Sequence, residues 1–311
     1  MSRTVVIKLG TSSIIDEFTH DIRSSLVEGV ASTIAALRDA GCRVVLVSSG
    51  AVGFGLLRMG FASRPDNLSG KQALAAVGQG EMMLMWSNAF AQRGIVVAQI
   101  LLTHEDISSP SRYNNAIRTL NELLSIGVVP IVNENDTLST KEIQIGDNDT
   151  LGAITATMIH ASYLFLLTDV DSLYESNPKY DVHASRIDMV TSISSLKNRI
   201  DSSNLGPGSA NGTGGMATKL RAAEIASAAG IFTVLASSSR PSVVSEILEY
   251  YEDDPMSDLA STMSDSFPTN AVSRSNKKDT RPLHTIFFPD PSPSQPPSLA
   301  PLGFRIPPLS V

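Results

Sequence analysis

Short apolar runs alternate with amphipathic segments along the first 250 residues of the chain. Residues 4–9 and 43–48 are apolar and rich in β-branched side chains, which predicts two buried strands. Between them, apolar residues recur with the period of a helix over 22–37, and Gly41 follows as a helix-stop signal. The alternation continues with strands predicted at 95–102, 128–132, 163–167 and 231–235, and with helices predicted at 70–91, 112–126, 150–160, 216–229 and 242–251.

This order of elements indicates a fold class. Continuous apolar strands separated by amphipathic helices are typical of a mostly parallel sheet that is covered on both faces. The sequence therefore predicts an α/β protein, a three-layer αβα sandwich around a mostly parallel central sheet. In such sheets ligands bind beyond the carboxyl ends of the strands, so we expect functional residues in the loops that follow the strands.

Proline marks the expected end of the folded domain. Of the 17 prolines, 11 lie in the last 60 positions, where the stretch 290–298 is dominated by Pro and Ser. Because proline lacks an amide donor and resists both helix and sheet, this stretch favours an extended or disordered chain. We therefore expect one domain over residues 1–250 and a linker and disordered tail over residues 251–311.

Composition narrows the class of protein. The chain has 24 Lys+Arg against 31 Asp+Glu, and this acidic balance argues against a general nucleic-acid binder. No apolar run reaches the roughly 18 residues of a membrane span, and the residues before Val5 are too few for a signal peptide. Cys42 is the single cysteine, which excludes an internal disulfide framework and a cysteine-ligated zinc site. These observations favour a cytoplasmic protein without a membrane partner.

Small, charged and amide residues follow most of the predicted strands. The loops are Lys8-Leu9-Gly10-Thr11-Ser12, Ser48-Ser49-Gly50-Ala51-Val52-Gly53, Asn133-Glu134-Asn135-Asp136 with Gly146-Asp147-Asn148-Asp149 after it, and Thr168-Asp169. Small residues let backbone amides face a ligand, and the polar side chains supply charge and hydrogen bonds. These loops are expected to share one edge of the sheet.

A glycine-rich turn, Gly212–Lys219, opens the helix predicted at 216. Glycines allow close backbone approach, free amides at a helix start attract anions, and a lysine adds a positive charge. These properties favour a site for the phosphates of a nucleotide. A flexible loop before a helix is the alternative, because the turn matches neither the P-loop pattern nor G-x-G-x-x-G after a strand.

The other strand-end residues each have a functional and a structural interpretation. Lys8 lies inside an apolar run, so it either extends its amine from a strand end or directs that charge at a phosphate. Ser49–Ala51 could bind a carboxylate or phosphate, or simply form a tight turn. Asp136, Asp147 and Asp149 could hold Mg²⁺, accept an ammonium group or orient lysines, or form a solvated acidic loop.

Taken together, two lysines from distant strand ends, two anion-binding turns and an acidic loop indicate a phosphoryl-transfer cleft. No residue stands out as a catalytic base. A carboxylate acceptor, with a pKa near 4.3, is already ionised at neutral pH and needs none. The remaining obstacle is repulsion between two anions, which lysines, helix amides and Mg²⁺ are suited to offset.

These motifs resemble the amino-acid kinase superfamily and, within it, the glutamate 5-kinases. The resemblance covers nearly all of residues 4–250 and includes Lys71–Gln79 and Gln99–Thr103 besides the loops above. The combination of Asn133–Asp136, Gly146–Asp149 and Gly212–Met216 is specific to glutamate 5-kinases among their relatives.

The resemblance implies ATP-dependent phosphorylation of the γ-carboxylate of L-glutamate to glutamyl 5-phosphate, the first step of proline biosynthesis, with Mg²⁺ arriving with ATP. It assigns catalysis to Lys8, Lys219 and Asp149; glutamate binding to Ser49, Gly50, Ala51, Asn133, Asp136 and Asn148; and ATP binding to Lys8, Gly10, Thr168, Asp169, Thr213, Gly214, Gly215, Met216, Ala217, Thr218 and Lys219. It also implies a homo-oligomer, feedback inhibition by proline, and hand-off of the product to glutamate-5-semialdehyde dehydrogenase.

Two departures from the resemblance leave alternatives open. Gln144 stands where many relatives have a lysine, and the prolines after 281–289 leave no place for the PUA domain that many relatives carry. A non-catalytic protein that binds glutamate, ATP or proline is one alternative. A sister kinase that uses another acceptor is the other.

Overall fold

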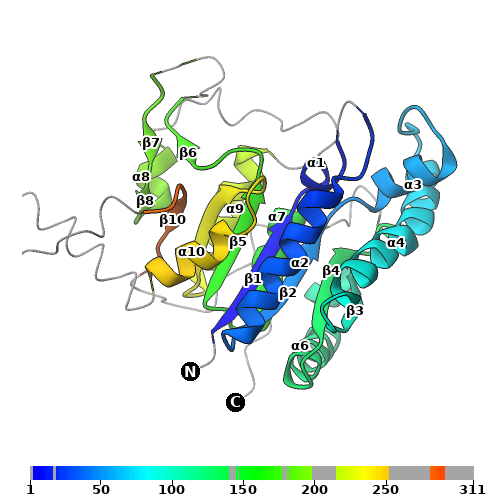
Figure 1. Cartoon of the computed structure of the whole chain (residues 1–311), viewed down its shortest axis with the longest axis horizontal. Coiled ribbons are helices and arrows are strands. Elements are labelled where there is room, and N and C mark those ends of the chain that lie inside the picture. The colour runs from blue at the N-terminus through cyan, green and yellow to red at the C-terminus, as the bar shows by residue number, and fades with distance from the viewer. Residues whose placement is uncertain are drawn as a thin grey trace, which may run out of the picture.

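An eight-stranded sheet runs through the computed structural model, which describes residues 3–16, 19–139, 145, 147–176, 181, 183–197, 215–251 and 281–290. The strand order is β3-β4-β2-β1-β5-β9-β10-β8 (Figure 1). The strands are β1 (Thr4–Leu9), β2 (Arg43–Ser48), β3 (Val97–Leu102), β4 (Val129–Glu134), β5 (Tyr163–Thr168), β8 (Met189–Val190), β9 (Phe232–Ser237) and β10 (Thr285–Phe287). Strands β3, β4, β2, β1, β5 and β9 pair in parallel, which confirms the predicted class of sheet.

Helices cover both faces of this sheet. The longer ones are α2 (Ser24–Asp39), α3 (Ala51–Met59), α4 (Leu68–Ala91), α6 (Pro110–Ser125), α7 (Asn148–Met158), α9 (Met216–Ala228) and α10 (Val243–Tyr250). Short elements complete the described fold: α1 (Thr11–Ile14), α5 (His104–Ser108), α8 (Ile193–Lys197), and the pair β6 (Leu173–Tyr174) and β7 (Arg186–Ile187). No described helix has both the length and the apolar composition to cross a membrane.

The two faces of β1 belong to two different hydrophobic cores. Val5, Ile7 and Leu9 pack with residues of α2, α4 and α10, and α2 and α10 lie in front of the sheet in Figure 1. Val6 packs on the opposite face with residues of α6, α7 and α9. Because side chains alternate along a strand, Lys8 shares the face of Val6. The sequence at β1 therefore directs the lysine towards α7 and α9.

Helix α3 was missing from the predicted elements, and glycines explain why. Gly53 and Gly55 lower the intrinsic helix propensity of Ala51–Met59. They are used instead for close packing: a Cβ at Gly55 would lie 2.0 Å from the carbonyl oxygen of Leu74, and one at Gly78 of α4 would lie 1.8 Å from that of Ala51. Helix α3 is thus specified by a tertiary contact with α4 rather than by local preference.

The structure corrects one part of the predicted tail. Thr285–Phe287 was expected to belong to a disordered linker, but it forms β10, which pairs antiparallel with β9 and parallel with β8. All three residues are buried, so the apolar run outweighs the prolines on either side of it. The rest of the predicted tail, residues 252–280 and 291–311, lies outside the described residues.

Candidate active site

Lys8, Asp149 and Lys219 meet at the carboxyl end of β1. Lys8 Nζ lies 2.6 Å from Asp149 Oδ1, and Lys219 Nζ lies 3.3 Å from Asp149 Oδ2. The lysines come from β1 and the first turn of α9, and Asp149 comes from the first turn of α7. Residues that are far apart in the sequence therefore form one ion cluster, as the predicted phosphoryl-transfer cleft requires.

The electrostatics of this cluster leave an excess of positive charge. Burial alone would raise the pKa of Asp149, but Lys8 and Lys219, with hydrogen bonds from Lys8 and Thr218, lower it to about 2. The carboxylate is thus ionised at neutral pH and balances only one of the two ammonium groups. Both lysines are buried, at 5% and 8% exposure, so little water screens the remaining charge. A nearby anion such as a phosphoryl group would be stabilised there.

The start of α9 holds the same carboxylate from a second direction. The Thr218 hydroxyl lies 2.7 Å from Asp149 Oδ2 and 2.8 Å from the carbonyl oxygen of Gly215. Gly215 is the N-cap of α9 and makes no side-chain cap among the described residues, so the first amides of α9, from Met216 and Ala217, are available to an anion. Thr213 and Gly214 of the predicted phosphate turn lie outside the described residues.

A network of amide side chains lies on the β2–β4 side of Lys8. Asn148 Nδ2 donates to Ser49 Oγ at 2.6 Å and to Asn133 Oδ1 at 2.9 Å. Asn133 Nδ2 donates to Gln79 Oε1 at 3.0 Å, and Gln79 Nε2 donates to Gln99 Oε1 at 3.1 Å. Three predicted glutamate-binding residues are thus brought together. Gln79 and Gln99 had no predicted role, although both lie in stretches that carried the resemblance.

The turn after β2 is tight, as the structural interpretation expects, and it leads directly into a helix. Gly50 has φ of 122°, a conformation that favours glycine, and it is the N-cap of α3. Ala51 is the first residue of that helix and is buried. The tight turn therefore places a helix N-terminus beside Ser49, which suits a carboxylate or phosphate.

The three aspartates of the acidic loop have separate environments. Asp147 accepts hydrogen bonds from the backbone N–H and the hydroxyl of Thr150, so it caps α7. For Asp136, burial, with the charge of Glu134, raises the pKa to about 6, while Arg64 opposes the shift. Arg64 was not predicted, because only the fold brings its loop to Asp136. Gln144 and Gly146 lie outside the described residues.

A cavity of about 620 Å³ lies on the other side of Lys8, at the ends of β5 and β9. Its walls include Asp169, Tyr174, Ser237 and Arg240. Thr168 donates a hydrogen bond from its hydroxyl to Asp169 Oδ1 at 2.9 Å. The cavity therefore adjoins the residues predicted to bind the nucleotide.

The order of the strands sets these parts in a row. The amide network lies at the ends of β2 and β4, the ion cluster lies at β1, and the cavity lies at β5 and β9. Gly10 adjoins the ion cluster, since a Cβ there would lie 3.6 Å from Lys8 Nζ. The described part of the chain contains no group of three or more His, Cys, Asp or Glu side chains arranged to hold a metal ion.

The chain is similar in sequence to a known family and to several known proteins. The sequence pattern of the Amino acid kinase family matches residues 3–237. An uncharacterized protein of Saccharomyces cerevisiae is 49% identical over 249 residues, covering 80% of this chain and 59% of its own length. A probable glutamate 5-kinase of Schizosaccharomyces pombe is 48% identical, and the match covers 81% of this chain and 61% of that protein. The glutamate 5-kinase of Synechococcus elongatus is 46% identical, with 80% and 67% covered. The chain thus spans about three fifths to two thirds of these relatives.

Solved structures share the fold at much lower identity. UMP kinase from Ureaplasma parvum superposes with a TM-score of 0.58 at 15% identity, covering 93% of this chain and 99% of its own. An isopentenyl phosphate kinase gives a TM-score of 0.56 at 18% identity, with 79% and 95% covered. These similarities support the three-layer architecture and say nothing about the acceptor.

Proposed function

This chain belongs to the amino acid kinase family, and from that membership and the geometry of its site we propose that it transfers the γ-phosphoryl group of ATP to the γ-carboxylate of L-glutamate. The product is glutamyl 5-phosphate. The observation that carries the proposal is the convergence of the Lys8 and Lys219 amines on Asp149, between the amide network and the cavity. Identity of 46–48% to glutamate 5-kinases supports the choice of acceptor.

The lysines supply the charge that the reaction needs. Phosphoryl transfer places negative charge on the transferring group and on the oxygens that enter and leave. Asp149 holds both amines in place and remains ionised, so the amines need not reorganise when that charge develops. An acceptor carboxylate is ionised at neutral pH, which explains how the site works without a general base.

Glutamate would bind at the β2–β4 side of the cluster. Ser49, Asn133 and Asn148 offer hydroxyl and amide groups, and the amides of Gly50 and Ala51 at the start of α3 favour a carboxylate. Asp136 would pair with the ammonium group of the substrate. The raised pKa of Asp136 fits that role, because a carboxyl that burial keeps short of counter-charge gains from a cationic ligand.

ATP would enter as its magnesium complex on the β5–β9 side. Thr168 and Asp169 lie beside the cavity there, and the start of α9 with Lys8 and Lys219 suits the phosphates. Magnesium commonly keeps several waters and shares the phosphates of its nucleotide, so Mg·ATP can be bound without an all-protein metal cage. Homo-oligomer formation, inhibition by proline and hand-off to glutamate-5-semialdehyde dehydrogenase remain predictions of the same proposal.

Trapping the acyl phosphate with hydroxylamine tests the proposal. We expect glutamyl hydroxamate to form only when glutamate and Mg·ATP are both present, with aspartate, acetylglutamate and UMP as competing acceptors. Folded protein that yields no hydroxamate would refute the proposal. If such protein still bound glutamate and nucleotide, a non-catalytic binding protein would explain the site instead.

A further inference from the structure

Residues Arg281–Asp290, defined here as the strap, contribute Leu283 to the wall of the cavity. The strap lies outside residues 3–237, the part of the chain that the family pattern matches. Its strand β10 lies between β9 and β8, and Ile286 and Phe287 are at most 1% exposed. The strap is therefore an integral part of the sheet next to the proposed nucleotide site.

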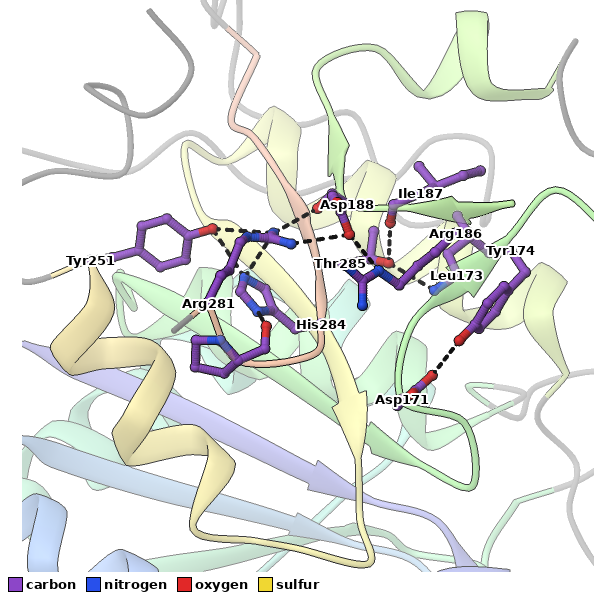
Figure 2. Close-up of polar contacts among 11 residues, drawn as sticks. Asp171, Leu173, Tyr174, Arg186, Ile187, Asp188, Tyr251, Arg281, His284 and Thr285 are labelled. Atoms are coloured by element: carbon purple, nitrogen blue, oxygen red, sulfur yellow. Dashed lines mark hydrogen bonds and ion pairs between the residues drawn. The ribbon is translucent and has the colours of Figure 1, made fainter. Parts of the chain in front are cut away.

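Polar contacts fix the strap at its first residues (Figure 2). Arg281 Nη1 forms an ion pair with Asp188 Oδ1 at 3.1 Å, and Arg281 Nη2 donates to the carbonyl oxygen of Asp188 at 3.1 Å. His284 is fully buried; its Nδ1 lies 2.7 Å from the carbonyl oxygen of Pro282 and its Nε2 lies 3.0 Å from the Tyr251 hydroxyl. A carbonyl only accepts, so Nδ1 donates to Pro282. A guanidinium only donates, and Arg281 Nη2 lies 3.2 Å from Nε2, so Nε2 accepts and the ring is neutral and held at both nitrogens.

Thr285 ties the strap to the short hairpin of β6 and β7. Its hydroxyl accepts from the backbone N–H of Leu173 at 2.7 Å and donates to the carbonyl oxygen of Ile187 at 2.6 Å (Figure 2). Thr285 is also paired with Leu235 in the antiparallel register of β10 and β9. Leu283 comes two residues before this strand, and it lines the same cavity as Ser237 at the carboxyl end of β9.

Leu283 is part of the cavity wall. It faces the same space as Asp169, Asp171, Tyr174 and Val243, yet 47% of its surface is exposed. The Tyr174 hydroxyl donates to Asp171 Oδ1 at 2.9 Å, which holds one carboxylate at the wall (Figure 2). Two carboxylates repel phosphate but accept hydrogen bonds from ribose hydroxyls or an exocyclic amine, and the apolar walls suit a flat base.

We propose that Leu283 is a nucleotide-binding residue, forming an apolar wall against the base and ribose of a nucleotide whose phosphates lie at Lys8 and Lys219. The proposal rests on the proposed function only in requiring that the ligand is a nucleotide. The exposed leucine surface is then covered on binding, and the anchors at Arg281, His284 and Thr285 hold the wall in position. The strap thereby contributes to nucleotide affinity from outside the region that defines the family.

Direct binding of Mg·AMP-PNP by isothermal titration calorimetry tests this. Leu283→Ala removes part of the apolar wall, and we expect Kd to rise roughly 5-fold, which corresponds to about 1 kcal/mol. Leu283→Met keeps the volume and apolar character and should bind within about 2-fold of the wild type. Leu84→Ala is the matched control, because Leu84 is an exposed leucine on α4, away from the cavity.

A second variant separates the wall from its anchors. Arg281→Met removes the ion pair with Asp188 and should raise Kd while lowering Tm. Leu283→Ala should raise Kd, and KM for ATP, with Tm and KM for glutamate unchanged.

Leu283→Ala that binds Mg·AMP-PNP like the wild type would overturn the proposal and leave the kinase assignment intact. If the protein forms no hydroxamate but its nucleotide binding still depends on Leu283, the kinase assignment is refuted and the role of Leu283 in nucleotide binding is supported. Wild-type protein that does not bind Mg·AMP-PNP would refute both.

Discussion

Asp136 offers a substitution that should improve stability while weakening substrate binding. Its carboxyl has a pKa of about 6 in the fold against an ordinary 3.8, because burial and the charge of Glu134 outweigh the attraction of Arg64. The folded protein therefore binds this proton more tightly than the unfolded chain. The stability that the proton supplies is fully present below pH 3.8 and is lost as the pH rises through about 6.

The magnitude follows from the two pKa values. The difference between 3.8 and about 6 corresponds to about 3 kcal/mol of unfolding free energy that the ionised carboxyl loses at neutral pH. Asp136→Asn keeps the shape and removes the charge. We expect its free energy of unfolding to be about 1–3 kcal/mol higher than that of the wild type at pH 7.5. The lower part of this range allows for solvent that reaches the site and for the loss of a counter-charge to Arg64.

Urea unfolding at pH 7.5 and pH 4 measures this effect. The two proteins should differ at pH 7.5 and converge at pH 4, where the wild-type carboxyl is protonated. Asp66→Asn, at an exposed aspartate in the loop before α4, is the matched control. An Asp136→Asn protein that is less stable at pH 7.5, or that differs equally at both pH values, would refute the reasoning.

The same variant should bind glutamate poorly. A charge-assisted hydrogen bond to the substrate ammonium is worth about 1.5–3 kcal/mol, so KM for glutamate should rise about 10- to 100-fold. In the wild type, glutamate affinity should increase as the pH rises through about 6, and Asp136→Asn should abolish that increase. Unchanged KM for glutamate would remove Asp136 from the acceptor site.

Three further predictions concern the ion cluster and the helix contact. Lys219→Ala should lower kcat in the hydroxamate assay by about 10²- to 10³-fold and change KM for glutamate little, because the amine acts on charge that develops in the transition state; an unchanged kcat would contradict that role. Asp149 should lose its stabilising contribution as the pH falls from 3.8 through about 2, so the acid unfolding profile of Asp149→Asn should be flatter there than that of the wild type. Gly78→Ala should destabilise the fold by about 1–3 kcal/mol or more, since its Cβ would lie 1.8 Å from a carbonyl oxygen. Gly80→Ala on the same helix is the control: its Cβ meets nothing within 4 Å, so the variant should be neutral or stabilising in thermal unfolding.

The sequence predicted the elements whose signal is local. The apolar run of β1 and the helical period before β2 each depend on nearby residues, and the structure places both within a few residues of the predicted bounds. Helix α3 and strand β10 were not predicted, for opposite reasons. The glycines of α3 lower its helix propensity, although they allow it to pack closely on α4. The prolines around Thr285–Phe287 argue against a strand, and the strand is too short to identify alone.

The residues of the candidate site differ in the same way: some have a local sequence signal and others do not. Lys8, Asp149 and Lys219 were identified from their motifs, and the structure brings them together as expected. Arg64 and Leu283 carry no motif of their own. Each reaches its site through packing between segments that are distant in sequence, which no periodicity or spacing in the chain encodes.

The position of Lys8 shows how closely the chemistry depends on the sheet. A donor at the ends of β5 and β9 and an acceptor at the ends of β2 and β4 can meet only over the strand between them, which is β1. On that strand, Ile7 and Leu9 point into the core with α2, α4 and α10, whereas residue 8 points towards α7 and α9, where Asp149 and Lys219 lie. A lysine one position earlier or later would bury its charge in the wrong core and leave the carboxylate with one amine. The alternation of β1 thus determines both the burial of its apolar residues in the sheet and the convergence of charge on which the proposed phosphoryl transfer depends.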